Sequence, residues 1–102
     1  MAEIQKGFYY HYKHNPNGEL SNYAYEVMGV GIHSETTEPF VVYRSLYESA
    51  DGKGGAQNLW LRPHSMFIEN VVKDGKEMKR FTKITDLKVI SELETIKHKM
   101  YD

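Results

Sequence analysis

Short runs of alternating aromatic, β-branched and polar residues fill most of the chain, and turn-forming residues separate them. Extended segments place successive side chains on opposite faces, and residues such as Tyr, Val, Ile and Phe favour strands. A single tight helical turn fits residues 64–66. The predicted strands cover residues 7–12, 23–33, 40–46, 59–63, 67–72 and 77–84.

The second predicted strand is apolar or small on both faces. Strict alternation would place Tyr25, Val27 and Gly29 on one face and Met28 and Val30 on the other. A strand with two such faces is expected at the centre of a sheet. The residues expected in the core are Val27, Val30, Val42, Leu61 and Phe67.

Two segments carry strong turn chemistry. Asp74-Gly75 is the preferred composition for a two-residue hairpin loop. A strict two-residue loop would set Lys73 opposite Lys76, and because like charges repel, a longer loop is an alternative. The glycine-rich segment from Asp51 to Ala56 is expected to be mobile and dispensable for folding.

Helical spacing replaces strand alternation in the tail, where the recurring apolar residues are Val89, Leu93, Ile96 and Met100. Thr85 or Asp86 can cap an early helix start, whereas the capping-box pattern at 91–94 would start the helix later. Residues 87–90 are therefore strand or helix. The apolar stripe must dock on the β domain or, alternatively, on a second copy as a homodimer.

Composition narrows the function classes. The 102 residues suit one domain, and 13% of them are aromatic, with 8 Tyr that are expected to be half-buried. A formal net charge of -1 argues against a strongly electrostatic nucleic-acid binder. The count of Cys is 0, which excludes disulfides and thiolate sites. With no apolar signal core and no membrane-spanning stretch, the expected location is the cytoplasm.

No sequence motif indicates catalysis or a cofactor. Gly29-Val30-Gly31 lacks the third glycine of a dinucleotide fingerprint, and the glycines at 52–55 lack phosphate-loop spacing. His11 and His14 are three residues apart, so a strand would point them to opposite faces and no metal site is expected. The expected sets of catalytic, metal-binding and cofactor-binding residues are therefore empty.

The best candidate for binding chemistry is the pair Trp60 and Arg62, which strand alternation places on one face. If Arg44 lies nearby, two guanidinium groups would flank an indole and could stack a ring and hold a phosphate or carboxylate. Alternatively, Trp60 packs in the core and Arg62 pairs with Glu69 or Glu26. The candidate ligand-binding residues are Tyr10, Tyr12, Tyr43, Arg44, Trp60 and Arg62.

Several phrases of the sequence resemble one known family. They are 7–13, Tyr25-Glu26-Val27-Met28-Gly29-Val30, His33-Ser34-Glu35-Thr36, Val41-Val42-Tyr43-Arg44-Ser45-Leu46-Tyr47, Leu59-Trp60-Leu61-Arg62-Pro63, Met66-Phe67, Asp74-Gly75-Lys76 and Arg80-Phe81. In this order they resemble the small bacterial DUF1653 family over about residues 6–84. The stretch 13–22 is longer than the family's short Lys-Gly link. The resemblance implies a bacterial origin and a domain at 1–84, followed by a helical extension at 85–102, but no activity.

The expected fold is mainly β, a small SH3-like β-barrel of about five strands with a C-terminal α-helix. The leading hypothesis is a non-enzymatic binding module with an aromatic and arginine groove for a peptide, a nucleotide or single-stranded nucleic acid. The alternatives are a small enzyme or nucleotide-processing accessory that uses Arg44, Arg62 and His33, and a structural subunit that dimerises through the tail.

Overall fold

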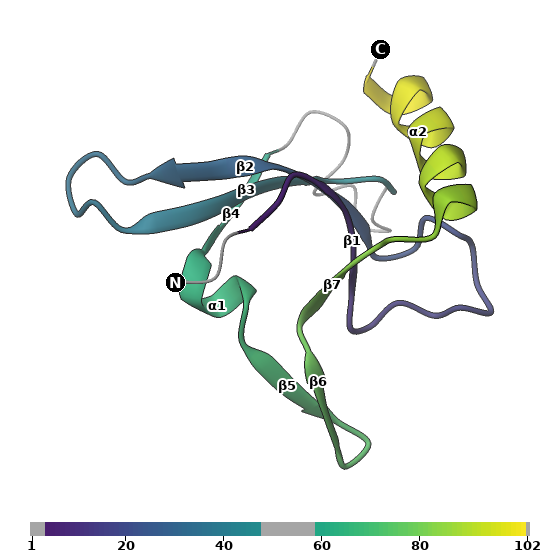
Figure 1. The fold of residues 1–102 in the computed structure, drawn as a ribbon, viewed down its shortest axis with the longest axis horizontal. Helices are drawn as coiled ribbons and strands as arrows, with labels where there is room; N and C mark the ends of the chain where they lie inside the picture. Colours follow the sequence, from purple (N-terminus) through teal and green to yellow (C-terminus); the bar gives the residue numbers. More distant parts are fainter. Residues whose placement is uncertain (1–3, 48–58, 102) are drawn as a thin grey trace.

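The computed structural model describes residues 4–47 and 59–101, which form seven strands and two helices (Figure 1). The glycine-rich segment from Asp51 to Ala56 lies outside the described residues. The elements in chain order are β1 Gly7–His11, β2 Ala24–Ile32, β3 Pro39–Ser45, β4 Trp60–Pro63, α1 His64–Phe67, β5 Asn70–Lys73, β6 Lys76–Lys79, β7 Phe81–Lys83 and α2 Leu87–Tyr101. The first four predicted strands and the single helical turn are confirmed. The predicted strand 67–72 is the shorter β5, and the predicted strand 77–84 is divided into β6 and β7, which belong to different sheets.

The main sheet is antiparallel and has the order β4-β3-β2-β1-β7. Within the described residues its two edge strands, β4 and β7, do not pair with each other, so the sheet is open. The predicted closed barrel is therefore wrong, although the mainly β class and the C-terminal helix are confirmed. The chain that follows β4 turns away at Pro63, which cannot donate a ladder hydrogen bond.

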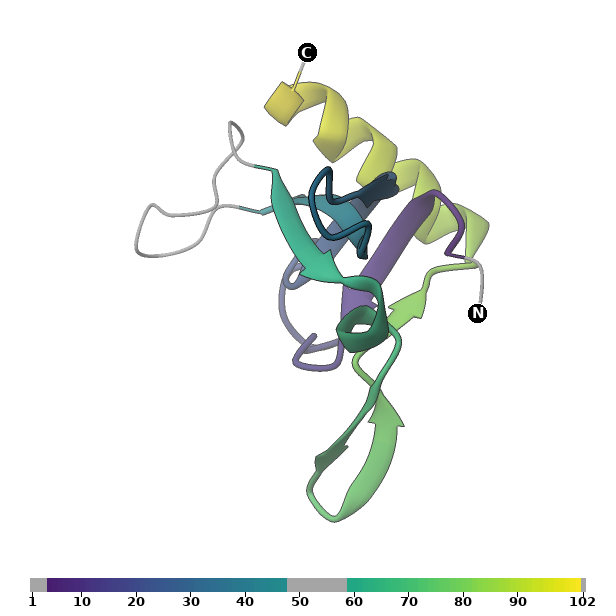
Figure 2. The same ribbon diagram turned by 90° about the vertical axis from the view of Figure 1, so that its left-hand side faces the viewer.

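The hairpin of β5 and β6 pairs only within itself and projects away from the main sheet (Figures 1 and 2). Its strands expose most residues on both faces, so it has no apolar face to add to a barrel wall. Lys73 pairs with Lys76, and the loop is the strict two-residue turn, with positive φ at Asp74 and Gly75. The longer loop was wrong because both lysines are exposed and their charges are solvated.

β2 contains a β-bulge at Met28. Val27 pairs with Tyr43 and Gly29 with Val42, so Met28 has no partner of its own. The extra residue changes the alternation, and Val30 therefore lies on the same face as Val27. The faces expected beyond residue 27 were wrong for this reason.

The core is divided between the two faces of the sheet. Val27 and Phe67 are buried as expected, but Val30 and Leu61 are 43% and 64% exposed, and Val42 is half-buried. Val30 lies towards the tip of the long β2–β3 hairpin, and Leu61 lies on edge strand β4, so few neighbours cover them. The first cluster consists of Tyr9, Val27, Val41, Tyr43, Phe67 and Phe81.

The second cluster joins α2 to the other face of the sheet. Leu93 is fully buried there, and Val89 and Ile96 are partly buried beside it. The Oδ1 atom of Asp86 accepts hydrogen bonds from the backbone N–H groups of Lys88 and Val89, so Asp86 caps the helix and residues 87–90 are helical. Docking of the tail on its own β domain is confirmed. The sheet residues of this cluster are Phe8, Ala24, Leu46 and Ile84.

Candidate functional site

The face of the sheet opposite α2 carries a continuous group of aromatic rings, which we call the aromatic face. Neighbouring centroids lie between 5.1 and 5.8 Å apart in the pairs that join His11 to Phe81, Tyr25 to Tyr43 and Tyr25 to Phe81. These distances and the steep angles between the rings are typical of edge-to-face contacts. The aromatic face consists of His11, Tyr23, Tyr25, Tyr43, Tyr47 and Phe81, with Trp60 and Arg62 from β4.

Trp60 and Arg62 share this face, as strand alternation predicts. Trp60 pairs with Tyr43 and Arg62 with Val41, and both partners point to the same side of β3. Trp60 is 39% exposed, so it is not a core residue. An exposed indole beside a half-buried guanidinium leaves a stacking surface open to a ligand.

Arg62 is held by aromatic groups. Its Nε donates a hydrogen bond of 3.3 Å to the Tyr43 hydroxyl, and its guanidinium carbon lies 5.6 Å from the Phe81 ring centroid. Of the carboxylates in residues 4–47 and 59–101, none forms an ion pair with Arg62. Glu69 pairs with Arg80 and Glu26 with Arg44, so the alternative pairing of Arg62 is not formed.

Arg80 and His11 belong to the same site, and the sequence interpretation missed both. His11 packs edge-on against Phe81. Burial first, and then the positive charges of Arg62, Lys13 and Arg80, lower the pKa of His11 from 6.5 to about 4. The sequence signal was available, since His11 follows Tyr9 at strand spacing and Arg80 directly precedes a core phenylalanine.

Tyr25 and Tyr47 form the polar part of the aromatic face. Their hydroxyl groups are hydrogen-bonded at 2.6 Å. Burial raises the pKa of both hydroxyls, and the hydrogen bond to Tyr47 raises the pKa of Tyr25 further. Both groups are therefore protonated at neutral pH, and they can donate hydrogen bonds but cannot serve as bases.

Tyr23 is positioned by an unusual backbone conformation. Its φ is 54°, in the left-handed region that non-glycine residues seldom adopt. The ring stacks on His11 at 5.6 Å and lies 5.6 Å from Tyr47. Strained residues of this kind concentrate at binding sites, and here the strain places a partly exposed ring at the edge of the aromatic face.

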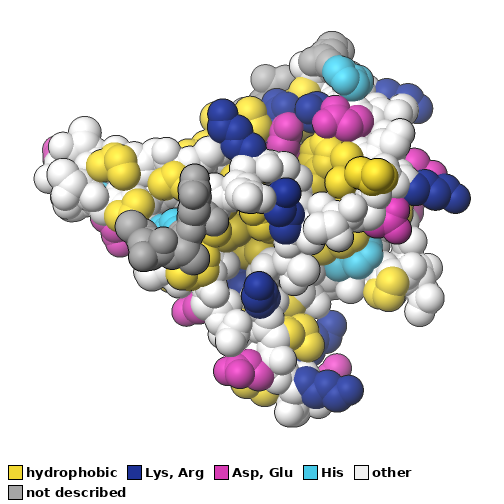
Figure 3. All heavy atoms as spheres, viewed as in Figure 1, with side chains coloured by type: hydrophobic (Ala, Val, Ile, Leu, Met, Phe, Trp, Pro, Cys, Tyr) yellow, Lys and Arg dark blue, Asp and Glu magenta, His cyan; other side chains and the backbone are white. Residues whose placement is uncertain are grey.

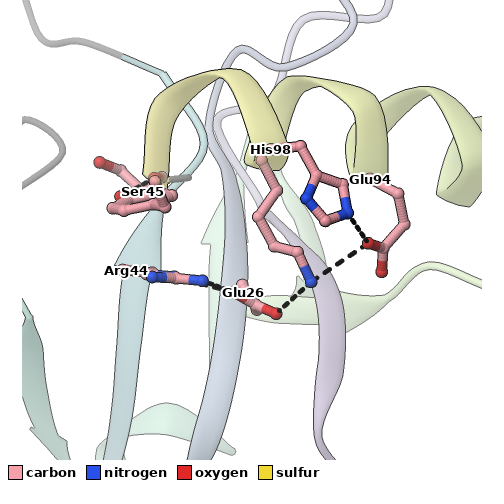
Figure 4. Close-up of polar contacts among 7 residues, drawn as sticks. Glu26, Arg44, Ser45, Glu94 and His98 are labelled. Atoms are coloured by element: carbon pink, nitrogen blue, oxygen red, sulfur yellow. Dashed lines mark hydrogen bonds and ion pairs between the residues drawn. The ribbon is translucent and has the colours of Figure 1, made fainter.

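Arg44 lies on the opposite face of β3, under α2 (Figure 4). Its guanidinium pairs with Glu26 at 2.8 Å and lies 3.8 Å from the Tyr101 ring centroid. Glu26 also binds Lys97 at 3.2 Å, and Lys97 in turn binds Glu94. This network of ion pairs joins α2 to the sheet. It also holds Arg44 on the face of the sheet opposite the Trp60 indole.

The six candidate residues are thus divided. Tyr43, Trp60 and Arg62 come together on the aromatic face. Tyr10 points to the other side, where its hydroxyl donates to the Leu20 carbonyl and its ring stacks on His14. Tyr12 follows the end of β1, and its ring lies 4.5 Å from His11 at the border of the aromatic face.

The residues of the enzymatic alternative do not converge. His33 lies at the β2–β3 turn, where its Nδ1 accepts hydrogen bonds from the backbone N–H groups of Glu35 and Thr36. Arg44 and Arg62 lie on opposite faces of the sheet. Among the described residues, no group of three or more His, Cys, Asp or Glu side chains could hold a metal ion. None of the described helices is long and apolar enough to cross a membrane.

The fold and site define a class: a small domain with an open antiparallel sheet, whose one face is covered by a helix and whose other face presents aromatic rings and a guanidinium group. The family model described as "Protein of unknown function (DUF1653)" matches residues 7–83. The chain belongs to the DUF1653 family.

One solved structure supports this assignment, the crystal structure of a DUF1653 protein from Bordetella bronchiseptica. The two chains are 27% identical and superpose with a TM-score of 0.62, over 79% of this chain and 87% of the other. No curated protein matches the chain. The family match ends before α2, so the helix that covers one face lies beyond the matched residues.

Proposed function

We propose that this protein is a binding module and that its aromatic face binds a nucleotide, either free or as part of a single strand. The observation that carries the proposal is Arg62, which has no carboxylate partner among the described residues and lies beside the exposed ring of Trp60. A nucleotide offers a flat base for the indole and a phosphate for the guanidinium.

The electrostatics of the site support an anionic ligand. Arg62, Lys13 and Arg80 all help to lower the pKa of His11. Arg80 is paired with Glu69, but Arg62 and Lys13 form no ion pair among the described residues and can face an anion. Because its pKa is low, His11 is neutral at pH 7, and its Nδ1 accepts a hydrogen bond from the Lys13 backbone N–H, so its Nε2–H is left to donate a hydrogen bond to a base. The chain's net charge of -1 supplies no general attraction to nucleic acid, so the local site must provide the affinity.

The test uses the intrinsic fluorescence of Trp60, the only tryptophan in the chain. Adenosine monophosphate and a short oligothymidylate serve as probes. We expect quenching that saturates with at least one probe and that weakens as salt is added. Tighter binding of the oligothymidylate would indicate that the ligand is a single strand. Tighter binding of adenosine monophosphate would indicate that it is a free nucleotide.

The decisive variant is Arg62→Gln, with Lys73→Gln as the matched control. Both remove one positive charge, but Lys73 lies in the projecting hairpin, away from the aromatic face. Loss of one charge-assisted contact should weaken binding roughly tenfold in Arg62→Gln only. Equal losses in the two variants, or no saturable binding of either probe to the parent, would overturn the proposal. Binding of an uncharged peptide instead would point to a peptide module.

A further inference from the structure

A pocket lies at the other edge of the sheet; it shares Phe81 with the aromatic face but does not include Trp60 or Arg62. It is an open pocket of about 380 Å³ between the N-terminal segment, the end of α1, β6 and β7. This volume falls within the range of small-molecule sites, about 300–1,000 Å³. In Figure 3, hydrophobic side chains are visible near the centre of the molecule, with Lys or Arg side chains beside them.

Core aromatic rings form the floor of the pocket. Phe67 and Phe81 stack in parallel, with centroids 4.1 Å apart and planes 5° apart, and Tyr9 meets Phe67 edge-on at 5.6 Å. All three residues are buried, so the floor is fixed before any ligand arrives. A preformed apolar floor lowers the entropic cost of binding.

The N-terminal segment provides one wall. The hydroxyl of Tyr9 donates a hydrogen bond of 2.8 Å to the Gln5 carbonyl, which holds Ile4 and Gln5 against the pocket. Ile68, which is 41% exposed, forms part of the opposite wall. Two isoleucine side chains facing an aromatic floor suit an apolar ligand body.

The polar rim carries two positive charges and no negative one. Lys79 and Lys83 line the pocket, and no Asp or Glu is among the lining residues. Within the described ranges, neither lysine forms an ion pair. Lys83 lies directly opposite Tyr9 in the sheet, so its side chain leaves the backbone at the border of the aromatic floor.

We propose that this pocket binds a small carboxylate with an apolar body, whose hydrocarbon part covers the floor and whose anionic end lies between Lys79 and Lys83. The inference is independent of nucleotide binding. The same chemistry is offered by a free organic acid and by the C-terminal residue of a peptide, and the experiment separates these sources.

The primary probes are 4-phenylbutyrate and its neutral counterpart 4-phenylbutanol. Their binding is measured by amide chemical shifts and by calorimetry. We expect the acid to bind and to shift the amides of Ile4, Lys79 and Lys83, and the alcohol to bind much more weakly. Equal binding of acid and alcohol, or the absence of any saturable binding, would overturn the proposal. Shifts confined to the Trp60 region would overturn it as well.

The variants isolate the two lysines. Lys79→Gln combined with Lys83→Gln should weaken binding of the acid roughly tenfold. Arginine at both positions should preserve this binding. The matched control is Lys73→Gln with Lys76→Gln, which removes the same charge from the tip of the β5–β6 hairpin. A comparable loss in the control would contradict the proposal, as would a loss in Arg62→Gln.

A short peptide ending in leucine, as the free acid and as the amide, identifies the source. If the peptide acid competes with phenylbutyrate and the amide does not, the pocket accepts a chain terminus. If neither peptide competes, the pocket takes free acids. Either result supports carboxylate recognition, while competition by the amide alone would contradict it. Unchanged thermal melting of each variant shows that the fold is intact.

Discussion

The guanidinium carbon of Arg44 lies 3.8 Å from the centroid of the Tyr101 ring, so β3, an interior strand of the sheet, and the last turn of α2 are in direct contact. The Tyr101 hydroxyl also donates a 2.5 Å hydrogen bond to the Ser45 carbonyl. A cation over an aromatic face stabilises by about 0.5–2 kcal/mol, depending on desolvation. The C-terminal helix is thus an integral part of the packing.

Truncation after Ile84 is therefore expected to lower the free energy of unfolding and to reduce solubility. It would expose Phe8, Ala24 and Leu46, which α2 now covers. The milder change Leu93→Ala should cost about 2–5 kcal/mol in urea denaturation, because Leu93 is fully buried. The exposed Lys99→Ala should change stability by less than about 0.5 kcal/mol.

Sedimentation of the same truncated chain tests the alternative of a homodimer formed through α2. If the parent and the truncated chain are both monomers, α2 packs only within its own chain. A dimeric parent that becomes monomeric on truncation would show that α2 also forms an interface. Unchanged stability of the truncated chain would contradict the packing described above.

Phe67→Ala is expected to cost about 3–5 kcal/mol, because Phe67 is 2% exposed and stacks on Phe81 in the centre of the first core cluster. The matched control is Val72→Ala, since Val72 is 71% exposed on the projecting hairpin. Thermal melting monitored by circular dichroism compares the two. Equal melting temperatures for Phe67→Ala and the parent would remove this ring from the core.

The two glycines of β2 should respond in opposite ways to alanine. Gly29 has a φ of 153°, where a side chain is strained, so Gly29→Ala should destabilise by about 1–3 kcal/mol. At Gly31 an added Cβ would lie in ordinary contact with Val42, 3.6 Å from its Cγ2. Gly31→Ala should be neutral or stabilise by up to about 1 kcal/mol. Urea midpoints that show the reverse order would contradict the bulge geometry.

His11 makes stability depend on pH. Its pKa is about 4 in the folded chain and 6.5 as the ordinary value, so the unfolded chain binds the proton more readily between these limits. Stability should fall as the pH drops from about 6.5 to 4. Nuclear magnetic resonance titration of the His11 ring, in the folded and the urea-unfolded chain, measures both values.

Arg62→Gln should raise the pKa of His11, because it removes one of the positive charges that lower it. Lys73→Gln, which is not among the charges that act on His11, should leave the value unchanged. A His11 pKa that is the same in the folded and unfolded chains would contradict the burial of this ring.

Local chemistry was enough to predict most of the elements. Asp74-Gly75 fixed the hairpin turn, and the spacing of Val89, Leu93 and Ile96 identified α2. Alternation also placed Trp60 and Arg62 on one face. In each case the determining signal lies within a few residues of the feature.

The remaining features depend on contacts between distant segments. The bulge at Met28 moves Val30 to the other face, and no nearby turn residue other than Gly29 marks it. Arg44 was assigned to the ligand site, but its partners Glu26 and Tyr101 come from β2 and α2. Closure of the sheet likewise depends on whether two edge strands meet, which local patterns do not encode.

The two faces of β3 contact different parts of the structure. Tyr43 packs in the aromatic face, while the adjacent Arg44 packs under the helix. A single-residue insertion or deletion in β3 that shifted the register at Tyr43 and Arg44 would exchange the faces of these two side chains, leaving a guanidinium among the rings and a tyrosine under α2. We therefore expect changes in length to be tolerated in the turn at 33–38 and residues 39–45 to accept substitutions only. Conservation of length in this strand should exceed conservation of sequence.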